Sequence, residues 1–168
     1  MVKAENGNLL ESIEKFGLDG VMNAANGKGP MGKGIAGAIR EIGGIQIQYD
    51  ACDICALKKP KEGDAYSTVS GKLFWKGIKR IIHAVTMKQP AGRTSVEICG
   101  KAFESALKLA EEEDIKNLGC TALGTGVGGL DAREVARIML PLAQKSKVNV
   151  AFMDFDADFI DELQKNLE

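Results

Sequence analysis

Two glycine-rich segments in this chain have the composition of phosphate-binding loops. The first runs Gly27-Lys28-Gly29-Pro30-Met31-Gly32-Lys33-Gly34, and the second runs Gly124-Thr125-Gly126-Val127-Gly128-Gly129. Glycines let the backbone approach a ligand closely, and unpaired N–H groups at the start of a helix attract phosphate oxygens. Two such loops on one cleft suit a diphosphate, because each phosphate group then meets its own set of amides.

Other interpretations of these loops, as a dinucleotide-binding motif, a P-loop or turns without a function, fit the sequence less well. The second loop matches G-x-G-x-x-G, but a dinucleotide-binding enzyme needs several further strand–helix units, and too few residues follow Gly129. Gln144 and Lys145 also stand where such an enzyme needs an acid for the ribose. Neither loop ends in G-K-[ST], which disfavours a P-loop ATPase. Glycine turns without a function explain one such loop but explain two poorly.

The loops need elements that bring them to one edge of a sheet, and the hydrophobic pattern predicts alternating strands and helices. Strands are predicted at 2–5, 19–23, 65–69, 80–85, 115–123 and 148–155, and helices at 9–16, 35–42, 45–57, from 94, from 131 and after 156. Thr94 with Glu97, and Asp131 with Glu134, fit capping boxes, and Asp156 or Asp158 caps the last helix. The order predicts one α/β domain over 1–168, with helices on both faces of a largely parallel sheet.

Composition excludes several function classes. The formal net charge is -1, from 22 basic and 23 acidic residues, so there is no strong nucleic-acid signal and no membrane-binding polybasic run. The first residues lack the apolar core of a signal peptide, and a cytoplasmic location is expected. Cys52 and Cys55 form a lone C-x-x-C, and His83 is the single histidine. A zinc site usually needs a second pair, so no metal and no cofactor are expected.

The motifs together resemble the macro domain family. Val21-Met22-Asn23-Ala24-Ala25-Asn26 is similar to its "V-x-N-A-A-N" signature, and Met31-Gly32-Lys33-Gly34-Ile35-Ala36 resembles the "G-x-G-[IV]-A" part of its first loop. The segment Leu123 to Leu130 resembles its second loop, "L-G-T-G-x-x-G". The resemblance implies a three-layer α/β/α sandwich with a mixed, largely parallel sheet. It also implies ADP-ribose, or a related metabolite, as ligand, and ADP-ribosylated proteins as a further class of partner.

The resemblance also implies roles for individual residues. Asn8 replaces an Asp that accepts from the adenine amino group in many relatives, Phe155 aligns with an adenine-stacking aromatic, and Asn26 contacts the distal ribose. A core position in the last strand is the other interpretation of Phe155. The full set of implied ligand-binding residues is Asn8, Leu9, Asn23, Asn26, Gly32, Lys33, Gly34, Ile35, Ala36, Gly124, Thr125, Gly126, Val127, Gly128 and Phe155.

For catalysis the sequence departs from part of the family, because Ala36 stands where one group of ADP-ribosyl hydrolases carries an acidic residue. Asn26 and Asp131 are the catalytic candidates, although Asp131 also fits a helix cap. The lysine that accompanies such an aspartate in relatives aligns ambiguously near Met87 and Lys88. His83 lies in an apolar run and fits a buried, hydrogen-bonded core histidine better than a catalyst.

Three functions therefore stay open. The first is a hydrolase of an ADP-ribosyl linkage, acting on an ADP-ribosylated carboxylate, O-acyl-ADP-ribose or ADP-ribose-1''-phosphate. The second is a non-catalytic reader of ADP-ribose, which the missing acid at Ala36 favours. The third is a nucleotide-binding fold outside the family.

Overall fold

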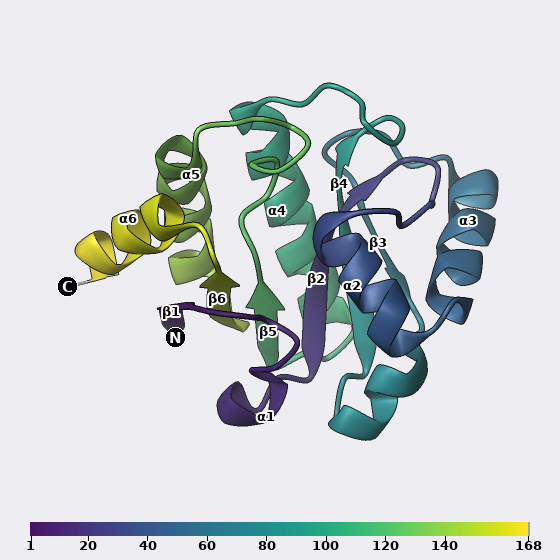
Figure 1. The fold of residues 1–168 in the computed structure, drawn as a ribbon, viewed down its shortest axis with the longest axis horizontal. Helices are drawn as coiled ribbons and strands as arrows, with labels where there is room; N and C mark the ends of the chain where they lie inside the picture. The colour runs from purple at the N-terminus through teal and green to yellow at the C-terminus, as the bar shows by residue number, and fades with distance from the viewer. Residues whose placement is uncertain (168) are drawn as a thin grey trace.

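The chain folds around one six-stranded sheet (Figure 1). The structure, a computed structural model, describes residues 1–167. The strand order is β1-β6-β5-β2-β4-β3, with every neighbouring pair parallel except β3 and β4. The strands are β1 (Val2–Asn6), β2 (Gly20–Asn26), β3 (Ala65–Thr68), β4 (Arg80–Met87), β5 (Asn117–Cys120) and β6 (Asn149–Asp154). This confirms the predicted α/β class with a mixed, largely parallel sheet.

Helices cover both faces of the sheet and give three layers. They are α1 (Ile13–Phe16), α2 (Gly34–Gly43), α3 (Gln46–Lys58), α4 (Val96–Glu112), α5 (Ala132–Lys145) and α6 (Ala157–Leu167), with a 3-10 helix η1 (Gly71–Lys76). Helices α4, α5 and α6 pack on one face, where Phe103, Phe152 and Phe159 are fully buried. Helices α1, α2 and α3 lie on the other, where Val21, Ile39 and Ile47 are buried. Both layers appear in Figure 1.

Residue alternation in β2 and β4 explains why these strands are central. Met22 packs toward α4 while its neighbour Val21 packs toward α2, so both faces of β2 are buried. The apolar run Ile81 to Val85 of β4 is likewise fully buried, as predicted for a central strand. No helix among residues 1–167 is both long enough and apolar enough to cross a membrane.

Several predicted boundaries were wrong. β2 continues to Asn26, because Ala24 and Ala25 still pair with β4. β5 ends at Cys120, and the chain then turns so that the Ala122 amide donates to the Asp154 carboxylate at 2.9 Å. Residues 9–12 form turns, so α1 is a single helical turn that ends at Gly17, whose φ of 56° suits glycine.

The helix caps were predicted in part. Ser95, not Thr94, caps α4, and its hydroxyl accepts from the Ile98 amide at 3.2 Å. Asp131 caps α5 by accepting from the Glu134 amide at 3.0 Å, and Asp156 caps α6 by accepting from the Phe159 amide at 3.2 Å. Helix α5 continues through Pro141 to Lys145, so this proline does not end it.

Candidate ligand-binding site

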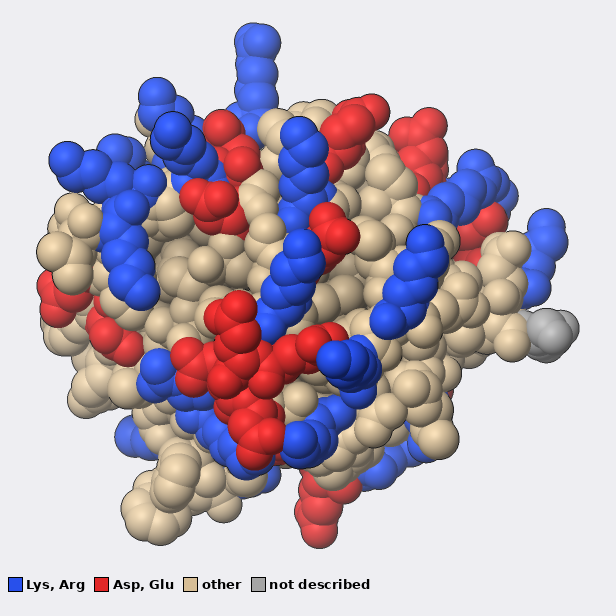
Figure 2. All heavy atoms as spheres, turned by 180° about the vertical axis from the view of Figure 1, so that it is seen from behind, with Lys and Arg blue, Asp and Glu red and all other residues tan. Residues whose placement is uncertain are grey.

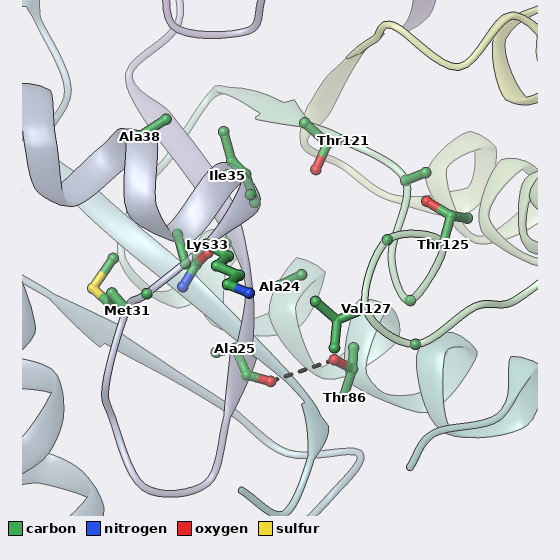
Figure 3. A pocket seen from close by; sticks show the side chains of 18 of the residues that line it. Ala24, Ala25, Met31, Lys33, Ile35, Ala38, Thr86, Thr121, Thr125 and Val127 are labelled. Atoms are coloured by element: carbon green, nitrogen blue, oxygen red, sulfur yellow. Dashed lines mark hydrogen bonds between the residues drawn. The ribbon is translucent and has the colours of Figure 1, made fainter. Parts of the chain in front are cut away.

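A cavity of about 720 Å³ opens at the carboxyl edge of the sheet, and both glycine-rich loops line it. Its size lies in the usual range for small-molecule sites. In Figure 3, Lys33 and Ile35 from the start of α2 lie across the cavity from Thr125 and Val127 of the second loop. The loops are about 100 residues apart in sequence, and the parallel sheet brings them together because β2 and β5 are neighbours.

The first loop is held in shape by the side chain of Asn26, at the end of β2. Its Oδ1 accepts from the amides of Lys28 and Gly29, both at 2.9 Å, and its Nδ2 donates to the Pro30 carbonyl at 2.9 Å. Gly29 has a φ of 108° and packs so closely on α3 that a Cβ would lie 2.6 Å from Cys52 Cα. Asn26 lines the cavity, but most of its hydrogen-bonding capacity is used to fix the loop.

The start of α2 presents free amides to the cavity. Lys33 is the N-cap residue, and its side chain makes no capping hydrogen bond. The first backbone bond of the helix joins the Gly37 amide to the Lys33 carbonyl, so the amides of Gly34, Ile35 and Ala36 precede the helical ladder. All three residues line the cavity. Unpaired amides at a helix N-terminus form an anion site.

The second loop offers a matching set of amides. Its own backbone bonds run from Gly129 to the Gly126 carbonyl and from Leu130 to the Gly124 carbonyl. The amides of residues 125–128 have no backbone acceptor within the part of the chain that the structure describes. Buried or ligand-facing amides are normally paired, so these four suit an anionic ligand.

The glycines in these loops divide into two kinds. A Cβ on Gly128 would lie 2.5 Å from the Gly124 carbonyl oxygen, and Gly124 has a φ of 74°, so the fold itself requires these two. Gly32 and Gly126 have neither a left-handed φ nor any atom within 4 Å of an added Cβ. The packing of residues 1–167 therefore does not require glycine at Gly32 and Gly126, and a side chain there would extend into the cavity that both residues line.

One end of the cavity, beside β1 and β6, is lined by Asn8, Leu9 and Phe155. Phe155 is 73% exposed and lines the cavity, so a core role for it was wrong. Leu9 is buried beneath this end. The oxygen of Asn8 already accepts from the Leu10 amide at 3.0 Å, whereas its Nδ2 donates to no acceptor within residues 1–167. The same oxygen also lies 3.4 Å from the Glu11 amide, so the Asn8 group left without a partner is Nδ2, and the role of Asn8 toward adenine stays a prediction.

Asp154 lines the same end and was missed in the sequence. Its Oδ2 accepts from the Ala122 amide at 2.9 Å, and its Oδ1 accepts from the Asp156 amide at 2.8 Å. Both carboxylate oxygens are thus engaged with the backbone, which fixes the ends of β5 and β6 around the cavity. Its position directly after the buried part of the last strand was the available signal.

The other end of the cavity is formed by the end of β4 and by the segment that follows it. Met87, Pro90 and Ala91 line it, and Ala91 adopts a φ of 56°, which is unusual for a residue other than glycine. Lys88 is not among the lining residues. The further lining residues, which were not among the ligand-binding candidates, are Gly7, Ala24, Ala25, Gly29, Pro30, Met31, Ala38, Thr86, Thr121, Ala122 and Met153.

Asp131 and His83 lie outside the open cavity. Asp131 is an exposed helix cap and is not a lining residue. His83 is fully buried and stacks on Tyr66 with ring centroids 4.6 Å apart, and burial lowers its pKa to about 3. The imidazole is therefore neutral near pH 7. These positions match a cap and a core histidine, and the catalytic role of Asp131 stays a prediction.

Charged and metal-binding groups are sparse around the cavity. Lys33 and Asp154 are the charged residues among those that line it. Cys52 and Cys55 lie within α3, and burial raises the pKa of both thiols. Residues 1–167 contain no group of three or more side chains arranged to hold a metal ion. Any anion bound here is held mainly by backbone amides.

Comparison with known proteins identifies what this arrangement resembles. The profile of the Macro domain matches residues 22–139. An uncharacterized protein of Aquifex aeolicus is 35% identical over 160 residues, which cover 93% of each chain. The O-acetyl-ADP-ribose deacetylase of Salmonella gallinarum is 30% identical over 129 residues, covering 75% of this chain and 70% of the deacetylase.

A solved structure shares the fold. The macrodomain of Trypanosoma brucei in complex with ADP-ribose has a TM-score of 0.78 and 20% identity, covering 99% of this chain and 69% of that one. Some relatives are longer, since this chain spans 65% of one from Aeropyrum pernix and 36% of one from Mycobacterium tuberculosis.

Proposed function

The chain belongs to the macro domain family, and from this premise we propose that it binds ADP-ribose and hydrolyses an ADP-ribosyl linkage. The domain is proposed to span the whole chain, residues 1–168. The observation that carries the proposal is the pair of free amide sets, at the start of α2 and at residues 125–128, on one cavity. Together they suit the two phosphate groups of a diphosphate.

The order of strands gives the ligand a direction. Phe155 and Asn8 follow β6 and β1 at one side of the cavity, and Pro90 and Ala91 follow β4 at the other. The proposed ligand places adenine against Phe155, its diphosphate between the loops, and the distal ribose near Asn26 and the segment after β4. An exposed aromatic at one end supports this direction, because adenine stacks on such a ring.

In the proposed hydrolysis, the protein accelerates the reaction mainly by holding the distal ribose and the diphosphate in place. The proposed substrates are an ADP-ribosylated carboxylate, O-acyl-ADP-ribose or ADP-ribose-1''-phosphate, each cleaved by water at the distal ribose. Asn26 fixes the loop against this ribose, and the amide dipoles hold the diphosphate. Proximity and fixed dipoles supply much of the rate in such a site without a strong base. The 30% identity to the deacetylase supports this class of reaction.

A non-catalytic reader of ADP-ribose is the second candidate. Ala36 supplies no acid, and Asp154, the carboxylate that lines the cavity, lies at the proposed adenine end with both oxygens engaged. A general base within reach of the distal ribose is therefore not evident among the described lining residues. These observations favour binding without turnover.

Nucleic acid is not part of the proposal. Figure 2 shows the face opposite to that of Figure 1, where basic and acidic side chains are mixed and a central acidic group is bordered by basic ones. Across the whole chain, ion pairs include Arg80 with Glu113 at 3.3 Å and Lys116 with Asp114 at 2.6 Å. The described atoms of this face form no basic groove of the kind that nucleic acid binds.

Asp131→Ala tests which role this residue has. We expect the variant to lose about 0.5–2 kcal/mol of stability, because the Glu134 amide loses its acceptor. Turnover of O-acetyl-ADP-ribose, ADP-ribose-1''-phosphate and an ADP-ribosylated glutamate should stay within about twofold of the wild type, because Asp131 does not line the cavity. Urea denaturation and the three hydrolysis assays measure both effects.

The same assays decide between the two candidate functions. A fall in rate of about 100-fold in Asp131→Ala, at unchanged ADP-ribose affinity, would assign it a general-base role instead. Binding of ADP-ribose by a wild type that cleaves none of the three substrates would remove the hydrolase and leave the reader.

A further inference from the structure

Three polar side chains form a buried chain of hydrogen bonds beside the cavity. Asn23 of β2 is 1% exposed, and His83 of β4 and Thr68 of β3 are fully buried. The Asn23 Nδ2 lies 3.0 Å from His83 Nδ1, and His83 Nε2 lies 2.8 Å from Thr68 Oγ1. We call these three residues the β2–β4–β3 relay. Buried polar atoms normally have a hydrogen-bond partner, so an atom of the relay without a partner needs an explanation.

The protons of the relay are assigned from the Thr68 hydroxyl, because each ring nitrogen of His83 can donate or accept depending on the tautomer. The Thr68 hydroxyl donates to the Val69 carbonyl at 3.0 Å, so its oxygen accepts from His83 Nε2–H. His83 Nδ1 is then the acceptor, and the Asn23 amide nitrogen donates to it. The neutral state of the buried imidazole, whose pKa burial lowers to about 3, agrees with one proton on the ring.

This arrangement leaves one atom without a partner. Asn23 Oδ1 is buried and has no hydrogen-bond partner among the described residues. Asn23 is also one of the residues that line the cavity. Leaving a buried acceptor unpaired is costly, and in a site this cost is removed when a ligand donates to it. Because the relay commits the Asn23 amide nitrogen to His83, the oxygen is the atom left for a ligand.

The position of Asn23 indicates which part of a ligand this is. β2 lies between β5, which leads to the second glycine loop, and β4, which leads to Met87, Pro90 and Ala91. Asn23 pairs with His83 on the β4 side, away from Phe155 and Asn8. This side of the cavity is the proposed place of the distal ribose.

We propose that Asn23 is a positioning residue whose Oδ1 accepts a hydrogen bond from a hydroxyl of the distal ribose, directly or through one water molecule. His83 and Thr68 fix the amide so that it presents its oxygen rather than its nitrogen. The inference rests on the proposed binding of ADP-ribose. It assigns the buried histidine an indirect part in recognising an uncharged hydroxyl group.

The test compares Thr68→Val with Thr68→Ser, since Thr68 lies outside the cavity lining. Valine has the shape of threonine but cannot accept from Nε2–H, so the imidazole moves its proton to Nδ1 and the Asn23 amide turns its oxygen to His83. The cavity then meets an N–H donor, and affinity for ADP-ribose should fall about tenfold. Affinity for ADP, which lacks the distal ribose, should stay within about twofold. Serine keeps the hydroxyl and should retain the wild-type ratio.

His83 provides a second readout, because it is the single histidine in the sequence. Nitrogen-15 NMR of the wild type and of Thr68→Ser should show the Nε2–H tautomer, and Thr68→Val should show Nδ1–H. An Nδ1–H tautomer in the wild type would overturn the inference without any variant. Equal loss of ADP and ADP-ribose affinity in Thr68→Val would also overturn it, since a general packing defect predicts that result. A wild type that binds no ADP-ribose would instead overturn the proposed function, and this inference with it.

Discussion

Gly126→Glu is expected to lower the affinity for ADP-ribose by about 100-fold or more. Gly126 has no left-handed φ, and no atom lies within 4 Å of an added Cβ, so the new side chain enters the cavity instead of disturbing the fold. It covers the amides of residues 125–128 and places a carboxylate against the phosphates. Loss of two hydrogen bonds to a charged group, at about 1.5 kcal/mol each, already gives this factor. Calorimetry with ADP-ribose measures it.

Two matched variants separate the effect of the added charge from the effect of the added bulk. Gly126→Gln has nearly the same bulk without the charge and should lose less affinity, while Gly126→Ala adds only a Cβ where the ligand approaches the backbone and should lose the least. The melting temperature of all three without ligand should stay close to that of the wild type. Survival of ADP-ribose binding in Gly126→Glu would show that the second loop is not the phosphate site.

Asn26→Ala is expected to have the second-largest effect, lowering ADP-ribose affinity about tenfold to 100-fold. The change leaves the amides of Lys28 and Gly29 and the carbonyl of Pro30 without their partners, and the loop that precedes α2 loses its shape. Three lost hydrogen bonds also predict a stability loss of about 1–3 kcal/mol. Turnover, if the wild type has it, should fall with binding. Calorimetry, hydrolysis and urea denaturation on one preparation measure all three quantities.

Asn26→Asp is the control for this prediction. Aspartate keeps both acceptor bonds to the loop amides but loses the donor to Pro30, so it should retain more stability than Asn26→Ala. Wild-type affinity in Asn26→Ala would mean that the first loop needs no such support and that Asn26 does not reach the ligand.

The sequence was sufficient to predict the sheet, the alternation of elements and the two loops that line the cavity. Glycine spacing and the apolar run of β4 are local signals, and they specify local structure that the tertiary fold preserves. Element boundaries were less predictable. β2 extends to Asn26 only because β4 lies alongside and pairs with it, which is a non-local cause. Thr94 has the capping-box partner Glu97 in the sequence, but Ser95 is the residue with extended backbone at the start of α4, and its hydroxyl accepts from the Ile98 amide.

The hydrogen-bonding roles of the site residues were harder to predict than the positions of these residues at the cavity. Asn26 was expected to face the ribose, but its hydrogen bonds show that it first organises its own loop. Asn8 was expected to offer its oxygen, which the turn before α1 uses instead. Pro90, Ala91 and Asp154 were missed because only the folded sheet brings the ends of β4 and β6 to the cavity. A side chain's available hydrogen bonds depend on neighbours that one sequence does not reveal.

Calorimetry of the wild type with ADP-ribose and AMP tests the central claim most directly. Both loops need a diphosphate to fill them, whereas AMP offers only the base, one ribose and one phosphate. We expect ADP-ribose to bind at least about tenfold more tightly than AMP, which corresponds to one or more additional charge-assisted hydrogen bonds. Equal affinities for AMP and ADP-ribose would contradict the assignment of the two amide sets to a diphosphate.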